Sequence, residues 1–599
     1  MIKLSDFLME RVAAAGVRHV FLVPGGATMH LNDSLGRTPG IEFVANLHEH
    51  ASAVAAEAYG KLTNNLGVAM VTAGPGSTNA LTGVATAWVN SSPVLFLSGQ
   101  VKRADLKGRR TIRQFGLQEI DIVSMVSPIT KYAATIDDPL RARSQLDQAL
   151  HAAREGRPGP VWLAVPIDIQ AAMIEPDSQE AFCPSSDAGS SDTGVREAVA
   201  RVLDWLAAAR RPVLLAGGGI RIAGAAQRFL ELARALGIPV QTTWVATDLL
   251  PEDHPLFAGR PGSFAPRAAN FAIQNSDFML AVGARLDFAT TGYSREQFAR
   301  GARRAVVDVD PAELDKLKGS VDLAIRADAG AFIDEALSQC GRLPPVDRSA
   351  WFGRIRIWKE RYPVLSADFK GHPNDTSTYV LVDELSKRLT SDDVIVEGSS
   401  GIHSEIFFLT YRTRPGQRVL ADGSYGSMGY GLPAAIGACL ASGRRTILVE
   451  GDGSLQPNLQ ELETVRRLGL PLKILVVNNS GYASIRASQQ RYFGRLVAAD
   501  STSGLTFPSI EKIAAAYGIA CSTVFREAEL AEKLEEALVR PGPAICEVRV
   551  PPEEDRVPRL ASFQKPDGSM VSKPLEDLFP FLNRDEFQSN MIIPPLPEE

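Results

Sequence analysis

The sequence predicts an α/β protein with three doubly wound parallel-sheet domains. Short apolar runs typical of buried strands alternate with helical patterns over most of the chain. The length of 599 residues exceeds what one hydrophobic core usually supports. Two polar or loosely patterned stretches, 175–194 and 341–375, divide the chain into parts of similar size. These observations favour three successive α/β units over a short-period repeat.

The domains are expected at residues 1–175, 195–340 and 376–550, followed by a Pro-rich tail at 551–599. Amphipathic helices are predicted over residues 1–16 and 51–62. We expect the tail to wrap a surface or the mouth of a site. Buried strands are predicted at 19–23, 67–72, 93–99, 212–219, 238–243, 278–287, 304–311, 393–398, 446–453, 473–479 and 544–550.

Composition narrows the class of protein. The net charge of −6 and the lack of a dense Lys/Arg run argue against a nucleic-acid partner. No long uncharged apolar window predicts a membrane span, and the N-terminus lacks the apolar centre of a signal peptide. The five cysteines are scattered, as expected of reduced thiols in a cytoplasmic protein.

Polar residues follow two of the predicted strands of the third domain. One apolar run ends in Gly-Asp-Gly at 451–453, and the next ends in Asn478 and Asn479. Mg²⁺ prefers oxygen ligands and commonly bridges a protein to phosphates. Asp452 can supply a carboxylate oxygen, Asn479 an amide oxygen and Gly481 a carbonyl oxygen. The alternative is an ordinary strand–turn–helix unit, but the two strand ends together favour a magnesium site.

Four further segments carry a resemblance to a known family: PGGA at 24–27, 45–63 (ANLHEHASAVAAEAYGKLT), 72–79 (TAGPGSTN) and 422–438 (DGSYGSMGYGLPAAIGA). With the GDG and NN motifs, the chain resembles the thiamine diphosphate-dependent acetohydroxyacid (acetolactate) synthase family over nearly its whole length. The resemblance implies pyrimidine-binding, central nucleotide-binding and diphosphate-binding domains, in that order. It also implies a homodimer or homotetramer whose active sites are shared between subunits.

The resemblance assigns the cofactor contacts residue by residue. Glu49 would lie at N1′ of the thiamine pyrimidine. Without the flanking motifs, the alternative interpretation is a surface glutamate on a helix. Met428 would support the bent cofactor, or else fill the core, and backbone groups near Gly426 would bind the pyrimidine. Backbone N–H groups at a helix start suit the diphosphate. Gly453 and Ser454 are the candidates there, with Ser399 and Ser400 as weaker ones that more often only cap a helix.

The middle domain resembles the FAD-binding domain of the same family. The candidate FAD contacts are Gly217, Gly218, Gly219, Arg285, Asp308 and Asp328. FAD would have a structural role, because acyl transfer needs no redox step. The alternative is an empty domain, and residues 283–292 (GARLDFATTG) depart from the usual family pattern.

The implied reaction decarboxylates a 2-oxo acid, with pyruvate as the expected donor, and transfers the acyl carbanion to a carbonyl acceptor. Gln118 is retained, but Leu117 replaces a phenylalanine and the family's tryptophan after Asn479 is absent. A different acceptor is therefore expected. His30 could move a proton during carbon–carbon bond formation or contact substrate, and His48 and His50 read as core or interface hydrogen-bond donors.

The acceptor itself stays open. The segment 479–494 resembles acetyl-transferring enzymes of branched deoxysugar biosynthesis, whose acceptor is a keto-sugar. Four polar side chains could meet hydroxyl or phosphate groups, or could form only a solvated helix face: Arg486, Gln489, Gln490 and Arg491. A thiamine-dependent 2-oxo acid decarboxylase or dione hydrolase, which needs no acceptor, and a non-catalytic relative are two further possibilities.

Overall fold

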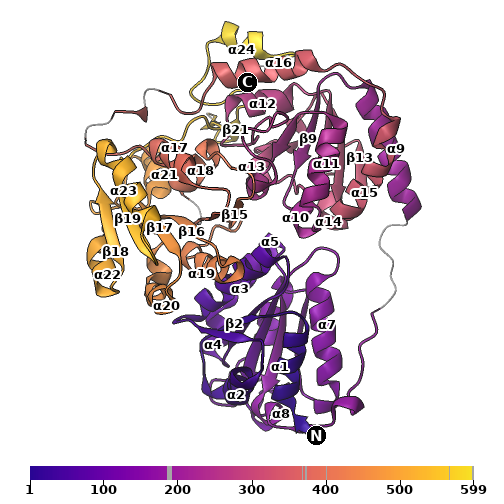
Figure 1. The fold of residues 1–599 in the computed structure, drawn as a ribbon, viewed down its shortest axis with the longest axis vertical. Coiled ribbons are helices and arrows are strands. Elements are labelled where there is room, and N and C mark those ends of the chain that lie inside the picture. Colours follow the sequence, from indigo (N-terminus) through magenta and orange to yellow (C-terminus); the bar gives the residue numbers. More distant parts are fainter. Residues whose placement is uncertain (185–191, 367–368, 372–373, 399–400, 566, 597–599) are drawn as a thin grey trace.

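The computed structural model describes residues 1–184, 192–366, 369–371, 374–398, 401–565 and 567–596. It contains three parallel β-sheets, each within a separate α/β domain, so the predicted fold class is confirmed. The N-terminal domain forms the lower part of the molecule in Figure 1, and the central and C-terminal domains lie side by side above it.

The N-terminal domain has a six-stranded sheet with the order β3-β2-β4-β5-β7-β6. The direction of winding reverses between β2 and β4, which creates a switch point at the carboxyl ends of the strands. Its strands are β2 (His19–Leu22), β3 (Glu42–Ala45), β4 (Gly67–Val71), β5 (Val94–Gln100), β6 (Tyr132–Thr135) and β7 (Val161–Pro166). Its longer helices are α1 (Leu4–Ala14), α2 (Met29–Arg37), α3 (Glu49–Thr63), α5 (Leu81–Asn90) and α7 (Ala142–Arg154).

The central domain has a five-stranded sheet with the order β10-β9-β11-β12-β13. The strands are β9 (Pro212–Ala216), β10 (Val240–Thr242), β11 (Phe278–Val282), β12 (Arg303–Asp308) and β13 (Leu323–Arg326). The longer helices are α9 (Asp192–Ala208), α11 (Ala226–Leu236), α12 (Arg267–Gln274), α15 (Ala329–Gln339) and α16 (Ser349–Arg361).

The C-terminal domain repeats the strand order of the N-terminal domain, as β15-β14-β16-β17-β19-β18. The strands are β14 (Val394–Glu397), β15 (Arg418–Ala421), β16 (Thr446–Gly451), β17 (Leu472–Asn478), β18 (Ala520–Val524) and β19 (Ala544–Arg549). The helices are α17 (Thr378–Arg388), α18 (Ile402–Thr410), α19 (Gly431–Ser442), α20 (Leu462–Leu468), α21 (Ala483–Phe493), α22 (Ile510–Ala516) and α23 (Glu527–Val539).

Small residues let helix α3 of the first domain lie directly on α19 of the third. Ala53, Ala55 and Ala56 are fully buried in α3, and Gly437 faces them from α19. A Cβ atom at Gly437 would lie 2.2 Å from the Ala55 carbonyl oxygen. The contact merges residues of both domains into one hydrophobic cluster. The two domains therefore hold a close mutual position.

The tail packs on the central domain and carries the hairpin β20 (Ser562–Gln564)–β21 (Met570–Ser572) and helix α24 (Arg584–Asn590). The Trp358 indole N–H donates to Asn590 Oδ1 at 2.9 Å, and Phe587 joins the hydrophobic cluster around Trp358. Within the described ranges, no helix combines the length and apolar character needed to cross a bilayer. All five cysteines are free thiols.

Candidate active site

The predicted metal ligands lie on neighbouring turns at the carboxyl edge of the C-terminal sheet. Strands β16 and β17 are paired in parallel, and the Asp452 N–H donates to the Val477 carbonyl at 3.1 Å. Asp452 is buried and accepts hydrogen bonds from the N–H groups of Gly453 (3.0 Å) and Gly481 (3.2 Å). The structure therefore brings the Asp452 carboxylate and the turn around Gly481 together.

The side-chain oxygen of Asn479 is buried and has no hydrogen-bond partner. The main-chain oxygen of the same residue is satisfied, because it accepts from Arg486 at 3.0 Å. Burial also raises the pKa of Asp452 to about 7, although backbone N–H groups counteract the shift. A buried amide oxygen without a partner, beside a desolvated carboxylate, fits a hard cation. The cation would coordinate the amide oxygen and would offset the free energy lost when the carboxylate is buried.

Amide and carbonyl oxygens matter here because carboxylates are scarce at the site. The described residues contain no group of three or more His, Cys, Asp or Glu side chains arranged to hold a metal. Gly481 has φ = +156°, and a Cβ atom there would lie 2.4 Å from the Ala499 carbonyl oxygen. Glycine is thus required for the turn that presents this ligand set.

The segment predicted to meet the cofactor ring lies next to the predicted diphosphate site. The Gly429 N–H donates to Ser454 Oγ at 3.4 Å, which ties residues 426–429 to the turn after β16. Gly426 has φ = +68°, and Met428 is 42% exposed, so its side chain is available to a ligand and does not fill the core. Ser399 and Ser400 lie outside the described residues.

Glu49 begins helix α3 of the N-terminal domain. Its carboxylate accepts a hydrogen bond from Asn79 Nδ2 at 3.0 Å. A Cβ atom at Gly76 would lie 3.2 Å from Glu49 Oε1, so glycine leaves room for the carboxylate. These contacts stay within the N-terminal domain, and among the described residues no hydrogen bond links Glu49 to Asp452, Asn479 or Gly481.

The C-terminal domain of the same chain holds the segment before Glu49 in place. The buried Glu461 carboxylate accepts hydrogen bonds from Asn46 Nδ2 (2.9 Å), Leu47 N (2.8 Å) and His48 N (3.2 Å). On the other side of Glu49, the buried His50 ring contacts Asn458 Nδ2 at 3.1 Å. Glu461 and Asn458 are positioning residues that sequence reasoning missed, because their partners lie about 400 positions away in the chain.

Among the described residues, no hydrogen bond joins His30 or Gln118 to Glu49. His30 is half-buried near the start of α2, and His48 caps α3 by accepting from the His50 N–H at 3.1 Å. Gln118 is exposed with φ = +62°, and a Cβ at Gly74 would lie 2.3 Å from its carbonyl oxygen. The backbone of Gln118 therefore closes onto the turn that leads to Asn79.

The central domain forms a cavity of about 2260 Å³ against both other domains. Five of the predicted flavin contacts line it: Gly218, Gly219, Arg285, Asp308 and Asp328. Gly217 lies beneath the lining, where a Cβ would meet the Gly283 carbonyl oxygen at 2.1 Å. Asp328 caps helix α15 through the N–H groups of Gly330 and Ala331, and burial raises the pKa of Asp308.

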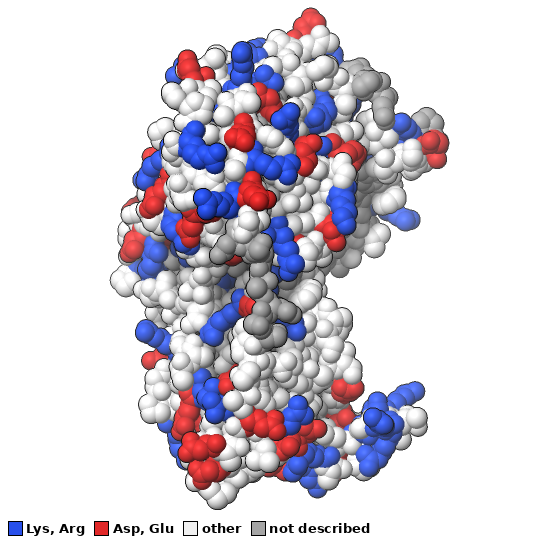
Figure 2. Space-filling view, turned by 90° about the vertical axis from the view of Figure 1, so that its right-hand side faces the viewer, with Lys and Arg blue, Asp and Glu red and all other residues white. Residues whose placement is uncertain are grey.

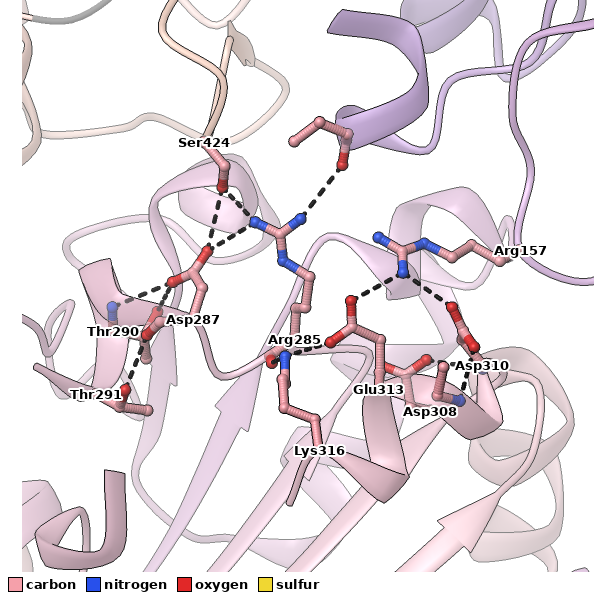
Figure 3. Close-up of polar contacts among 12 residues, drawn as sticks. Arg157, Arg285, Asp287, Thr290, Thr291, Asp308, Asp310, Glu313, Lys316 and Ser424 are labelled. Atoms are coloured by element: carbon pink, nitrogen blue, oxygen red, sulfur yellow. Dashed lines mark hydrogen bonds and ion pairs between the residues drawn. The ribbon is translucent and has the colours of Figure 1, made fainter. Parts of the chain in front are cut away.

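Arg285 connects all three domains in this cavity (Figure 3). Its guanidinium donates to the Val89 carbonyl of the N-terminal domain at 3.3 Å and to Asp287 at 3.1 Å. It also donates to the Ser424 hydroxyl of the C-terminal domain. Beside it, Arg157 of the N-terminal domain donates to Asp310 (3.0 Å) and Glu313 (2.9 Å) of the central domain. Arg285 therefore already has a carboxylate partner facing the cavity.

Three family models cover most of the chain. Residues 2–125, 199–336 and 399–548 match, in that order, the N-terminal TPP binding domain, the central domain and the C-terminal TPP binding domain of thiamine pyrophosphate enzymes. The chain belongs to the thiamine pyrophosphate enzyme family. The predicted resemblance is thereby confirmed, and its two TPP binding domains contain Glu49 and the Asp452–Asn479 turns.

Relatives place this thiamine pyrophosphate enzyme near one branch of the family. It is 31% identical to a probable acetolactate synthase large subunit of Methanocaldococcus jannaschii, with 92% of each chain covered. It is 31% identical to the acetolactate synthase isozyme 1 large subunit of Escherichia coli, covering 93% of this chain and 95% of that one. A probable chloroplastic acetolactate synthase 2 of Oryza sativa is 33% identical over 93% of this chain and 84% of its own. The comparisons favour an acetolactate synthase-like enzyme over a keto-sugar acetyltransferase or a hydrolase.

Proposed function

We propose that the protein is a thiamine diphosphate-dependent carboligase. It decarboxylates a 2-oxo acid, with pyruvate as donor, and joins the remaining acyl group to a carbonyl acceptor. The observation that carries the proposal is the buried, unpartnered Asn479 oxygen beside the buried Asp452 carboxylate in a TPP binding domain. The names of the relatives, acetolactate synthases, support the same class of reaction.

Asp452, Asn479 and the Gly481 carbonyl would hold Mg²⁺, and the metal would anchor the diphosphate. Gly453 and Ser454 would offer backbone and hydroxyl groups to the phosphates. The raised pKa of Asp452 supports this assignment, because a cation favours the ionised carboxylate that burial disfavours. When bound, thiamine diphosphate supplies the carbon nucleophile of the reaction.

Glu49 would hold a proton at N1′ of the cofactor pyrimidine. Asn79 keeps the carboxylate oriented, and Glu461 fixes the segment that leads to it. Met428 would support the ring from below, and the backbone near Gly426 would hydrogen-bond to it. His30 and Gln118 would contact substrate and move the proton that the new alkoxide requires.

We further propose that two copies of the chain share each active site. Among the described residues, no hydrogen bond joins Glu49 to Asp452 in its own chain, and both domains expose large apolar side chains. In the N-terminal domain these include Met29, Leu47, Phe115 and Leu117, and in the C-terminal domain Tyr425 and Met428. Exposed apolar surface of this kind is typical of protein interfaces. A homodimer, or a pair of them, would place Glu49 of one protomer at the metal site of the other.

FAD in the central cavity is a weaker proposal than thiamine diphosphate. The size of the cavity and the glycine turn at 217–219 support it. The Asp287 carboxylate on Arg285 opposes it, because a flavin phosphate would have to replace that partner. A flavin absorption spectrum of the purified protein tests this point.

Subunit complementation tests the shared site directly. Glu49→Gln and Asp452→Asn homodimers should each lack carboligase activity with pyruvate. Mixed dimers keep one site with both native groups, so refolding the two variants together should restore about one quarter of wild-type activity. If the mixture stays inactive although two differently tagged variants co-purify as mixed dimers, the proposal of a shared site is wrong.

A further inference from the structure

The structure separates the four polar residues that follow the metal turn. Arg486 is buried and donates to the carbonyl oxygens of Asn479 (3.0 Å) and Pro552 (2.7 Å). Gln489 exchanges hydrogen bonds with the main chain of Val497, at 2.7 and 3.1 Å. These two residues therefore hold the local fold. Gln490 and Arg491 are exposed and line a cavity, to which Arg486 also contributes.

This cavity has a volume of about 1580 Å³ and lies between helix α21, the C-terminal tail and the central domain. Ala483 and Ile402 are among its lining residues. Ala483 begins the helix that directly follows the Asn479–Gly481 turn, so the cavity borders the segment that continues from the proposed metal ligands. Ligand pockets usually measure roughly 300–1,000 Å³, and this one has room for a molecule much larger than a simple 2-oxo acid.

Arginine side chains gather on one wall of the cavity. Arg559 is half-buried, with its guanidinium 4.8 Å from the Phe579 ring centre. Burial lowers the pKa of Arg559, and the nearby positive charges of Arg491 and Arg556 lower it further. Among the described residues, the Arg559 guanidinium has no hydrogen-bond or ion-pair partner. Three arginines thus share this wall, and of the three only Arg556 has a carboxylate partner among the described residues, so an added anion would reduce the repulsion between them.

The acidic residues near the cavity neutralise only part of this wall. Glu554 accepts from Ser377 Oγ (2.6 Å) and Thr378 N (3.0 Å), and Asp577 is paired with Arg584 at 2.8 Å. Arg556 pairs with Glu405 at 2.6 Å and still presents a face to the Phe264 ring. Asp555 is near enough to attract Arg559 but forms no ion pair with it.

We propose that Arg559, Arg491 and Arg556, which we call the arginine pocket, bind a phosphate group of the acceptor substrate. The inference rests on the proposed carboligase function and names the chemical class of its acceptor. Planar guanidinium groups bind phosphate through paired, charge-assisted hydrogen bonds. In the reaction, the donor loses CO₂, its acyl carbon bonds to the acceptor carbonyl carbon, and the carbonyl oxygen takes up a proton. The phosphate itself stays unchanged and positions the carbonyl.

Two aldehydes that differ only in the phosphate test the proposal. Wild-type holoenzyme should join pyruvate to glyceraldehyde 3-phosphate with a kcat/KM roughly 10- to 100-fold higher than for glyceraldehyde. Arg559→Gln should abolish most of that preference through KM and leave the glyceraldehyde reaction unchanged, whereas Arg559→Lys should restore part of it. Arg526→Gln removes a cation from the exposed start of α23 and should keep the wild-type ratio.

A binding measurement shows whether the arginine pocket takes the phosphate of an acceptor or a free phosphate effector. It also distinguishes a failure of the pocket from a failure of the proposed carboligase function. Pyrophosphate titrated into the holoenzyme should bind to wild type and Arg526→Gln, and roughly tenfold or more weakly to Arg559→Gln. If pyrophosphate alone accelerates the glyceraldehyde reaction, the pocket serves an effector and the acceptor assignment is wrong. Equal pyrophosphate binding by wild type and Arg559→Gln overturns the pocket itself. Loss of all pyruvate turnover with intact pyrophosphate binding overturns only the proposed function.

Discussion

The N-terminal and C-terminal domains have the same strand order but carry different chemistry at the carboxyl ends of their strands. In the C-terminal domain, β16 and β17 lead into the buried Asp452 and Asn479. In the N-terminal domain, the corresponding strands β4 and β5 lead into Thr72 and Val101, and Gln100 at the end of β5 donates to the Ile120 carbonyl at 2.9 Å. A single scaffold therefore carries the proposed metal ligands in one copy only.

This contrast indicates that the fold supplies the position and the turns supply the chemistry. The N-terminal domain contributes a carboxylate, Glu49, after β3, where the C-terminal domain has Asp422 after β15. Asp422 is already engaged by the N–H groups of Ser427 (3.0 Å) and Tyr425 (3.3 Å). Figure 2 shows both charge signs interspersed on one face of the molecule, with basic side chains gathered on a projection of the lower, N-terminal part. This face has no single sign of charge that would account for the different chemistry of the two domains, so individual side chains must account for it.

The largest expected effect separates binding from chemistry. Asp452→Asn removes the charged ligand, so Mg²⁺-dependent binding of thiamine diphosphate should weaken by roughly 100-fold or more. Glu49→Gln should leave that binding nearly intact and lower turnover by roughly 100- to 10,000-fold, because only the proton at the pyrimidine is affected. Fluorescence titration with the cofactor and assays of acyl transfer measure the two effects. If both variants lost thiamine diphosphate affinity equally, the proposed division between metal binding in the C-terminal domain and proton holding in the N-terminal domain would be wrong.

The next effect concerns how the two domains meet. Gly437→Val places side-chain atoms where the Ala55 carbonyl stands, 2.2 Å from the new Cβ. The helices α3 and α19 must then separate, and we expect a loss of about 3 kcal/mol in the free energy of unfolding. Gly353→Ala is the matched control, since its Cβ meets no atom within 4 Å in helix α16 and should stabilise slightly. Thermal unfolding of both variants measures whether disturbing the α3–α19 contact lowers the free energy of unfolding by this amount.

Strands that form continuous apolar runs, and motifs at the ends of such strands, could be predicted from the sequence. The runs at 446–453 and 473–479 correspond to β16 (Thr446–Gly451) and β17 (Leu472–Asn478). The edge strand β3 was missed because Glu42 and Phe43 are exposed and interrupt the apolar pattern. The strand predicted at 278–287 ends at Val282, where Gly283 turns with φ = +58° to pack on Gly219.

Long-range partners in the site could not be predicted in the same way. Asp452 and Asn479 stand out because each ends a strand, but Glu461 acts through a loop more than 400 positions away. Arg559 belongs to a tail whose sequence shows no regular period, and its role depends on packing against Phe579 and α21. Tertiary packing, which local sequence patterns do not encode, created these contacts.

An effect of similar size for each residue appears only in acid. The pKa of His50 in the N-terminal domain is lowered to about 4 by burial, with a further contribution from His48, and burial lowers that of His403 in the C-terminal domain to about 4. The unfolded chain takes up these protons near pH 6.5, so stability should fall as the pH decreases from about 6.5 to about 4, by about 3 kcal/mol for each histidine. His50→Gln and His403→Gln should each flatten this slope in urea unfolding. A double variant with the wild-type slope would contradict the assignment.

The smallest effect tests the side chain that joins both domains to the third. Arg285 reaches Val89 of the N-terminal domain and Ser424 of the C-terminal domain. Ser424→Ala removes the hydrogen bond that Ser424 accepts from Arg285 and the one it donates to Asp287 at 3.2 Å. Asp287 stays paired with Arg285, so we expect a loss of about 1 kcal/mol. Cofactor binding at Asp452 should not change, because Arg285 lies in the central cavity. Chemical unfolding measured beside thiamine diphosphate titration checks both statements. A variant that loses cofactor affinity instead would show that the C-terminal site depends on the central domain for its geometry.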